Sequence, residues 1–174
     1  MTTRRPRGLT LVELLVALVI IALVATATST LLVAAGDTER DVRARTGAQS
    51  EVEFAVARIT YNLRTAASVD DPAAAGVTQT TLASTTQADA SGQRARVYYR
   101  LYAGTLQEWD SRYNAGAPDD GDATHWTTLV HNVRTFSVQR DDSLALQRIL
   151  VHLGLGGPVA LTRDFQVALR NPGA

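Results

Sequence analysis

The sequence predicts an α+β protein, in which one long N-terminal helix packs on a C-terminal antiparallel β-sheet. Three observations predict this fold. Residues 9–35 are almost wholly apolar, residues 36–67 keep a helical repeat of apolar side chains, and short alternating runs begin at residue 94. The first two patterns indicate helix and the third indicates strands. A chain of 174 residues, 45% of them hydrophobic, is also large enough to form a hydrophobic core.

Residues 9–35 are long and apolar enough to cross a membrane. As a helix, residues 9–32 would span roughly 36 Å, and a bilayer core is about 30 Å thick. Glu13 is the only charged residue in this segment. Residues 1–8 contain three Arg and no acid, whereas acids and Arg are mixed after the segment. This asymmetry predicts a cytoplasmic N-terminus and an extracytoplasmic remainder.

Three kinds of targeting segment fit this pattern. They are a signal peptide cut after Ala27, an uncut signal anchor, and a leader cut before the apolar run. Glu13 favours the third, because a carboxylate in an apolar segment costs about 2.5–3.5 kcal/mol near the bilayer centre. Glu13 also completes a T-x-x-E capping box with Thr10, so a purely helix-capping role is the alternative.

The residues around Glu13 carry a family resemblance. Residues 8–15 read G-L-T-L-V-E-L-L, which resembles the G-F-T-L-x-E-L-L signature of type IV pilin-like proteins. The resemblance implies that prepilin peptidase cuts between Gly8 and Leu9 and methylates the amine of Leu9. It also implies that Glu13 serves assembly. Leu9 departs from the Phe that is usual in the family.

The role of Glu13 also has a physical rationale. Cleavage would leave a charged amine on Leu9 in apolar surroundings, where isolated charges are costly and paired charges largely cancel. The Glu13 of a neighbouring subunit reaches this amine only if the two helices are offset by a few residues. Pairing would therefore favour one axial register in a helical polymer.

Residues 36–67 read as an amphipathic continuation of the same helix. Val52, Val56, Ile59 and Leu63 recur close to the helical period, and Gly36 interrupts the apolar pattern. We expect this helix to end near Ala67. The predicted domain organisation is a leader over 1–8, a transmembrane and assembly helix over 9–35, the amphipathic helix over 36–67, and a β-rich pilin-like head over 68–174.

The remainder of the chain reads mainly as β-structure. Residues 72–93 are small and polar, which predicts a loop with at most one short strand. Apolar and alternating runs predict one antiparallel sheet of four to six strands. The expected strands cover residues 94–102, 105–109, 126–130, 135–140, 146–153 and 165–169.

These strands carry a second resemblance. G-T-L-x-x-W at 104–109 and L-V-H-N-V-R-T-F-S-V at 129–138 are similar to the minor pseudopilin J family of type II secretion systems and to PilW-like minor pilins. The resemblance implies a non-enzymatic structural subunit that helps to initiate or cap a fibre for protein secretion, motility or DNA uptake. Its expected partners are other pilin-like subunits, through the N-terminal helix, together with prepilin peptidase and the inner membrane.

No catalytic or cofactor site is expected. The chain has no Cys, no G-x-S-x-G elbow and no phosphate-binding glycine motif, and its three histidines lack the spacing of a helical zinc site. Calcium is a weaker hypothesis, because three acids surround Gly121 without the D-x-D-x-D-G spacing. The acids are Asp119, Asp120 and Asp122, and we favour a solvated loop.

Two alternatives remain at the level of sequence. One expected strand carries Arg94, Arg96 and Arg100 beside Tyr98, Tyr99 and Tyr102, and such a surface could bind single-stranded nucleic acid. All seventeen basic residues are Arg, and without the three of residues 1–8 fourteen face seventeen acids, so a formal charge of −3 disfavours this partner. The other alternative is an extracytoplasmic ligand-binding or enzymatic domain, held by a signal anchor or released by a signal peptidase.

Overall fold

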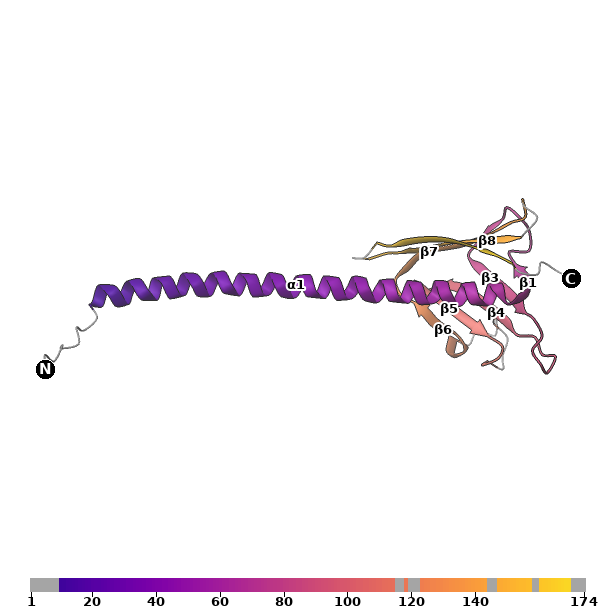
Figure 1. Cartoon of the computed structure of the whole chain (residues 1–174), viewed down its shortest axis with the longest axis horizontal. Coiled ribbons are helices and arrows are strands. Elements are labelled where there is room, and N and C mark those ends of the chain that lie inside the picture. The colour runs from indigo at the N-terminus through magenta and orange to yellow at the C-terminus, as the bar shows by residue number, and fades with distance from the viewer. Residues whose placement is uncertain (1–9, 115–117, 119–122, 144–146, 158–159, 170–174) are drawn as a thin grey trace, which may run out of the picture. The chain divides into compact units, whose positions relative to one another are not determined.

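The computed structural model describes residues 10–114, 118, 123–143, 147–157 and 160–169 (Figure 1). By internal contacts the chain forms two units, the first ending at Ala44 and the second beginning at Arg45. Helix α1 (Leu11–Arg64) contributes to both units. All strands belong to the second unit. The structure is thus a long N-terminal helix whose C-terminal part packs against antiparallel sheets, the α+β arrangement that the sequence predicts.

The first unit is helical throughout its described residues from Leu11 onward. Its large apolar side chains from Leu11 to Val33 are 50–82% exposed. Hydroxyl groups in this stretch donate to backbone carbonyls one turn earlier, as Thr26 does to Ala22 (2.6 Å) and Ser29 to Ala25 (2.8 Å). These bonds satisfy the polar side chains within the helix, as an apolar environment requires. The helix is continuous through Gly36.

In the second unit, α1 buries one stripe of side chains. Val52, Ala55, Ile59 and Leu63 are 0–2% exposed, which confirms the apolar repeat predicted for this part of the helix. The helix ends at Arg64, three residues before the predicted end at Ala67. The Thr65 amide bonds to the Tyr61 carbonyl (3.1 Å), and Ala66 already pairs with a strand. The small side chains of Ala66 and Ala67 do not show whether the chain is helical or extended at these positions.

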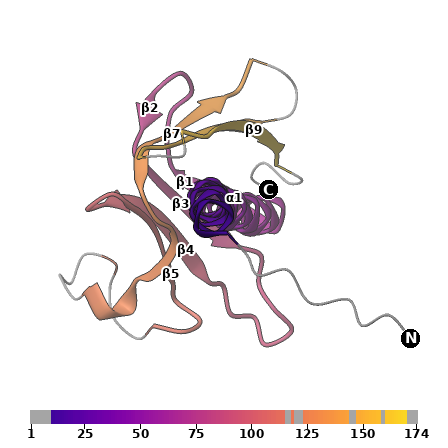
Figure 2. The same ribbon diagram turned by 90° about the vertical axis from the view of Figure 1, so that its left-hand side faces the viewer.

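The strands form two antiparallel sheets instead of the single sheet that the sequence predicts. The five-stranded sheet has the order β1-β3-β4-β5-β6, and the four-stranded sheet has the order β2-β7-β8-β9 (Figure 2). The first contains β1 (Ala66–Asp71), β3 (Thr81–Thr86), β4 (Arg96–Tyr102), β5 (Thr105–Asp110) and β6 (Thr127–Val130). The second contains β2 (Thr78–Gln79), β7 (Val133–Asp141), β8 (Arg148–Leu155) and β9 (Thr162–Ala168). A short 3-10 helix, η1 (Ala123–His125), precedes β6.

The chain passes from one sheet to the other between β6 and β7. Asn132 adopts a left-handed conformation there (φ 56°), and its carbonyl accepts a bond from the Gly156 amide (2.8 Å). An alternating pattern identifies a strand but does not identify its neighbours, because pairing depends on such corners. The prediction of one sheet was therefore wrong, although the runs from residue 94 onward correspond to β4–β9.

Residues 72–93 contain more structure than predicted. They include β2 and β3, and β3 lies between β1 and β4 with Leu82, Ala83 and Ser84 buried. The small Ala, Ser and Thr side chains of this segment hide its strand character, because strand prediction relies on bulky β-branched and aromatic residues. Between the predicted strands 94–102 and 105–109, Ala103 and Gly104 form a turn with positive φ at both residues (48° and 74°), as a two-residue hairpin requires.

One hydrophobic core joins the helix and the two sheets of the second unit. The stripe of α1 contributes Ile59 and Leu63, the five-stranded sheet contributes Tyr99, and the four-stranded sheet contributes Phe136 and Ile149, all of them at most 1% exposed. Figure 2 shows the sheets on different sides of the helix. The buried stripe of the helix thus faces the core between the sheets, whereas its opposite face, with Phe54 and Tyr61, stays exposed.

Candidate functional site

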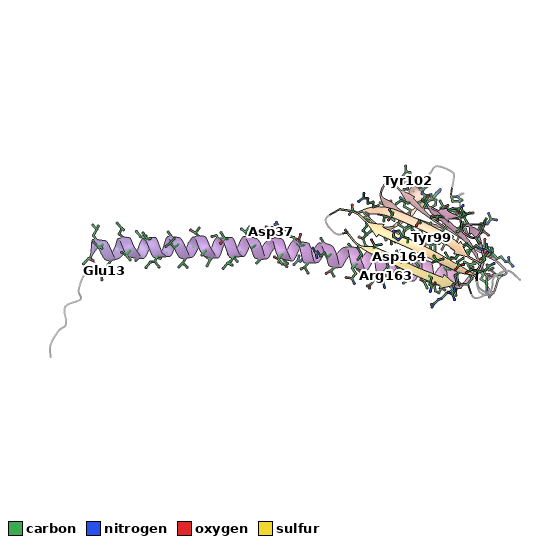
Figure 3. All side chains as sticks on the ribbon, turned by 90° about the horizontal axis from the view of Figure 1, so that it is seen from above. Glu13, Asp37, Tyr99, Tyr102, Arg163 and Asp164 are labelled. Carbon is green, nitrogen blue, oxygen red and sulfur yellow. The ribbon has the colours of Figure 1, made fainter. Side chains whose placement is uncertain are left out.

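The first candidate site is the start of α1, where Glu13 is labelled in Figure 3. Glu13 and Thr10 form the predicted capping box. The Glu13 Oε2 accepts from the Thr10 backbone amide (3.0 Å) and hydroxyl (3.1 Å), and the Thr10 Oγ1 accepts from the Glu13 amide (3.3 Å). Two amides of the first turn are thereby satisfied reciprocally. The other two predicted residues, Gly8 and Leu9, lie outside the described residues.

The direction of the Glu13 side chain has a chemical consequence. Its carboxylate bonds to the amide of Thr10, the residue that directly follows Leu9. An amine on Leu9 would therefore be formed one residue from an existing carboxylate. The assembly role implied by the resemblance would use the carboxylate that caps the helix, and the structure leaves both roles open.

Helix α1 is also the candidate membrane segment. Among the described residues it is the one helix long and apolar enough to cross a membrane, and its apolar part lies near the N-terminus. A signal sequence near the N-terminus meets the same criteria of length and composition. The apolar part includes Glu13, near one end of the helix, and no other charged residue before Asp37.

The second candidate site is a buried polar cluster in the second unit, which sequence reasoning missed. Arg58 of α1 binds Glu108 of β5 in a bidentate manner, with Nε–Oε distances of 3.1 Å and an Nη2–Oε1 distance of 2.9 Å. Its Nη2 also lies 3.6 Å from the Asp110 Oδ2, to which Arg112 Nη2 bonds at 2.6 Å. Glu108 and Asp110 are 6% and 2% exposed. Burial is tolerated because both carboxylates are paired.

Two neutral groups complete this cluster. Asn62 of α1 donates through Nδ2 to the Tyr99 hydroxyl (2.5 Å) and to Glu108 Oε2 (3.4 Å). Burial, followed by the negative charge of Glu108, raises the pKa of Tyr99 well above its ordinary value. Hydrogen bonding to Glu108 raises the pKa of Arg58 as well. Tyr99 therefore stays neutral and Arg58 stays charged near neutral pH, and the cluster joins helix to sheet.

Sequence reasoning missed the cluster because Arg58 and Glu108 are fifty residues apart. One signal was available. Asn62 falls inside the apolar stripe, between Ile59 and Leu63, and a polar residue there requires a buried partner.

Two of the three histidines lie beside carboxylates. The His131 amide and ring both contact Glu51 (3.0 and 3.3 Å), and His152 Nδ1 lies 2.5 Å from Asp164 Oδ1. No group of three or more His, Asp or Glu that could hold a metal is present within the described ranges. The three acids of the calcium hypothesis, Asp119, Asp120 and Asp122, lie outside the described residues.

Arg100, Tyr98 and Tyr99 of β4 make contacts within the protein, whereas the Arg96 side chain is exposed. The Arg100 guanidinium lies over the rings of Trp126 (3.7 Å) and Tyr102 (4.7 Å) and donates to Gln107 (3.1 Å). Tyr98 packs against Trp109 in a T-shaped arrangement, and Tyr99 is buried in the core. The Arg100 guanidinium occupies one face of the Trp126 ring, whereas Tyr102 stays 53% exposed. These contacts favour an ordinary solvated strand face over a surface for base stacking.

Comparison with known proteins identifies the N-terminal segment. Residues 3–29 match a family model described as the prokaryotic N-terminal methylation motif. No curated protein and no solved structure matches the chain. The matched residues include Gly8, Leu9 and Glu13, whereas the second unit lies outside the match.

Proposed function

We propose that this chain, which carries the N-terminal methylation motif of type IV pilin-like proteins, is a structural minor subunit of a pilin-like fibre. The motif match over residues 3–29 carries the proposal. The similarity of residues 104–109 and 129–138 to minor pseudopilin J and to PilW-like minor pilins supports the finer assignment. Such a subunit would help to initiate or cap a type II secretion pseudopilus or a type IV pilus.

In the proposed sequence of events, the chain is first inserted into the inner membrane. The apolar part of α1 spans the membrane once, with residues 1–8 in the cytoplasm and the β-rich unit outside. Prepilin peptidase then cuts between Gly8 and Leu9 and methylates Leu9. The exposed apolar surface of α1 before Ala35 supports this sequence of events, because lipid and later the helices of other subunits would cover it.

Glu13 is proposed to change partners during this process. In the uncut chain its carboxylate caps α1 through Thr10. In the fibre it would pair with the Leu9 amine of a neighbouring subunit. Protein secretion, motility and DNA uptake are all compatible with this step. The charge of −3 and the stacking of Arg100 on the Trp126 ring favour a process in which this chain does not bind DNA directly.

The first test is the N-terminus of the protein isolated from its own cells, determined by mass spectrometry. We expect a chain that begins at methylated Leu9. A chain beginning at Thr28 would contradict the proposal and indicate a secreted domain released by signal peptidase. An intact N-terminus would indicate a plain signal anchor, with Glu13 serving only as a helix cap.

The second test separates the two roles of Glu13. We expect Glu13→Ala to leave cleavage intact and to impair incorporation into the fibre. Thr10→Ala removes the hydroxyl half of the capping box but keeps the carboxylate and its bond from the backbone amide of residue 10, so we expect near-normal incorporation. Cleavage is read from mass, and incorporation from the chain recovered in sheared fibres. Equal defects in the two variants would show that Glu13 acts only through the cap.

A further inference from the structure

The second unit contains a polar cleft at the C-terminal end of α1 that the proposed function does not use. Its volume is about 640 Å³, within the range of ligand sites. The last turn of α1, the segment before β4 and the turn after β5 line it. Each of these three segments contributes one arginine to the lining, namely Arg64, Arg94 and Arg112.

The walls of the cleft are tied together by hydrogen bonds. The Gln87 amide donates to the Thr65 carbonyl (3.0 Å), and the Thr86 amide donates to the Ala95 carbonyl (2.7 Å). The Ser111 hydroxyl accepts from the Arg96 amide (2.9 Å). These bonds cross from one lining segment to another, so the cleft is preformed and a ligand would not have to order it.

The positive charge of the cleft exceeds its negative charge. Arg112 is neutralised by the buried Asp110. Arg64 and Arg94 are exposed, and neither has an ion pair within the part of the chain that the structure describes. Two guanidinium groups are thus available to a ligand.

The one acid in the lining, Asp89, is already engaged. Its Oδ1 accepts from the Ser91 amide (2.8 Å), the Ser91 hydroxyl (2.6 Å) and the Gln93 amide (3.0 Å). These bonds hold the loop and lower the pKa of Asp89. Asp89 and Asp110 together carry two negative charges beside three guanidinium groups, so the cleft has a net positive charge.

We propose that this cleft binds an oxyanionic ligand: carboxylate groups on an acidic segment of a partner protein, or a free oxyanion such as phosphate. Guanidinium groups recognise both through paired N–H donors. The arginines enter from separate segments of a cleft far larger than one phosphate group, which suits a ligand with several anionic groups. Tyr61, 58% exposed at the rim, offers an apolar surface to the ligand's backbone or side chains. The proposal does not depend on fibre assembly.

The test measures binding to the purified full chain in non-ionic detergent. The probes are a fluorescent hexaglutamate peptide, a hexaglutamine peptide of equal length, and inorganic phosphate as competitor. We expect the acidic peptide alone to bind, with an affinity that falls between about 0.02 and 0.3 M salt. In the Arg64→Gln/Arg94→Gln variant we expect an affinity at least about tenfold lower. Arg163→Gln, an exposed site on β9 (Figure 3), is the charge-matched control and should bind normally.

Competition by phosphate distinguishes the two sources of oxyanion. Displacement of the peptide by phosphate indicates a site for small oxyanions as well, whereas resistance to phosphate indicates a polypeptide ligand. The proposal would be overturned if neither the hexaglutamate peptide nor phosphate bound. An equal loss in Arg163→Gln, or no loss in the double variant, would also overturn it. Far-UV circular dichroism checks folding, and Arg94→Gln alone, outside the helix, serves if the double variant is unfolded.

Discussion

The two parts of α1 treat the same kind of side chain in opposite ways. Leu18, in the first unit, is 59% exposed, whereas Leu63, in the second, is fully buried. Charged residues differ as well. Arg43 pairs with Glu39 one turn away at the surface, but Arg58 pairs with a buried carboxylate on a strand. The backbone hydrogen bonds of α1 are continuous, but its apolar side chains are exposed in the first part and form a buried stripe in the second.

This difference shows where each part finds its partners. The second part is covered by side chains of its own chain, and its burial contributes to the stability of the second unit. The first part has apolar surface for which the described residues provide no cover. Its contacts must come from lipid, detergent or other chains, so its side chains should affect assembly and membrane binding more than folding.

The largest contrast is expected from one substitution made in each part. Leu63→Ala should lower the free energy of unfolding of the second unit by about 2–5 kcal/mol, because it leaves a cavity in the core. Leu18→Ala should change it by less than about 0.5 kcal/mol. Urea unfolding followed by tryptophan fluorescence measures both, since Trp109 and Trp126 lie in the second unit. Similar losses in the two variants would show that the parts are energetically coupled.

A smaller contrast is expected between the two arginines. Arg58→Met should destabilise the second unit by about 2–4 kcal/mol, because Glu108 stays buried without its cation. Arg43→Met should have an effect below about 0.5 kcal/mol, as for other exposed pairs. The same urea titration applies.

The double variant Arg58→Met/Glu108→Leu tests whether the unpaired charge of Glu108 causes this loss of stability. Removal of both charges should recover most of the stability lost in Arg58→Met. If the double variant were as unstable as Arg58→Met, the loss of stability would come mainly from lost packing of the arginine side chain. The unpaired charge of Glu108 would then not be its cause.

The smallest effect expected is a pH dependence within the second unit. Folding raises the pKa of Tyr99. Below about pH 10 the phenol therefore keeps its proton in both the folded and the unfolded protein, and its contribution to the free energy of unfolding is fully present. Above that pH only the unfolded state ionises, and the free energy of unfolding should fall by up to about 1.4 kcal/mol per pH unit. Tyr99→Phe should flatten this slope, as measured by urea unfolding between about pH 9 and 11. Tyr102→Phe, at an exposed ring, should keep it.

Several elements were predictable because their signals are local. The long helix follows from an uninterrupted apolar run and a repeat that ends with Leu63, and the turn at Ala103-Gly104 follows from its composition. The capping box of Thr10 and Glu13 spans only three residues and could be read directly. The match over residues 3–29 rests on the same kind of short, contiguous pattern.

The sequence by itself determined that the N-terminal part is one long helix, that several segments from residue 94 onward are extended, where the membrane-compatible surface lies, and that residues 3–29 carry an N-terminal methylation motif. Only the tertiary structure decided that the strands divide into two sheets, that Ala66–Asp71 and Thr81–Thr86 are strands, and that Arg58 meets Glu108. It also brought the three arginines of the polar cleft together. The physical reason is range: helix periodicity and capping act over a few residues, whereas strand partners and buried ion pairs depend on how distant segments pack.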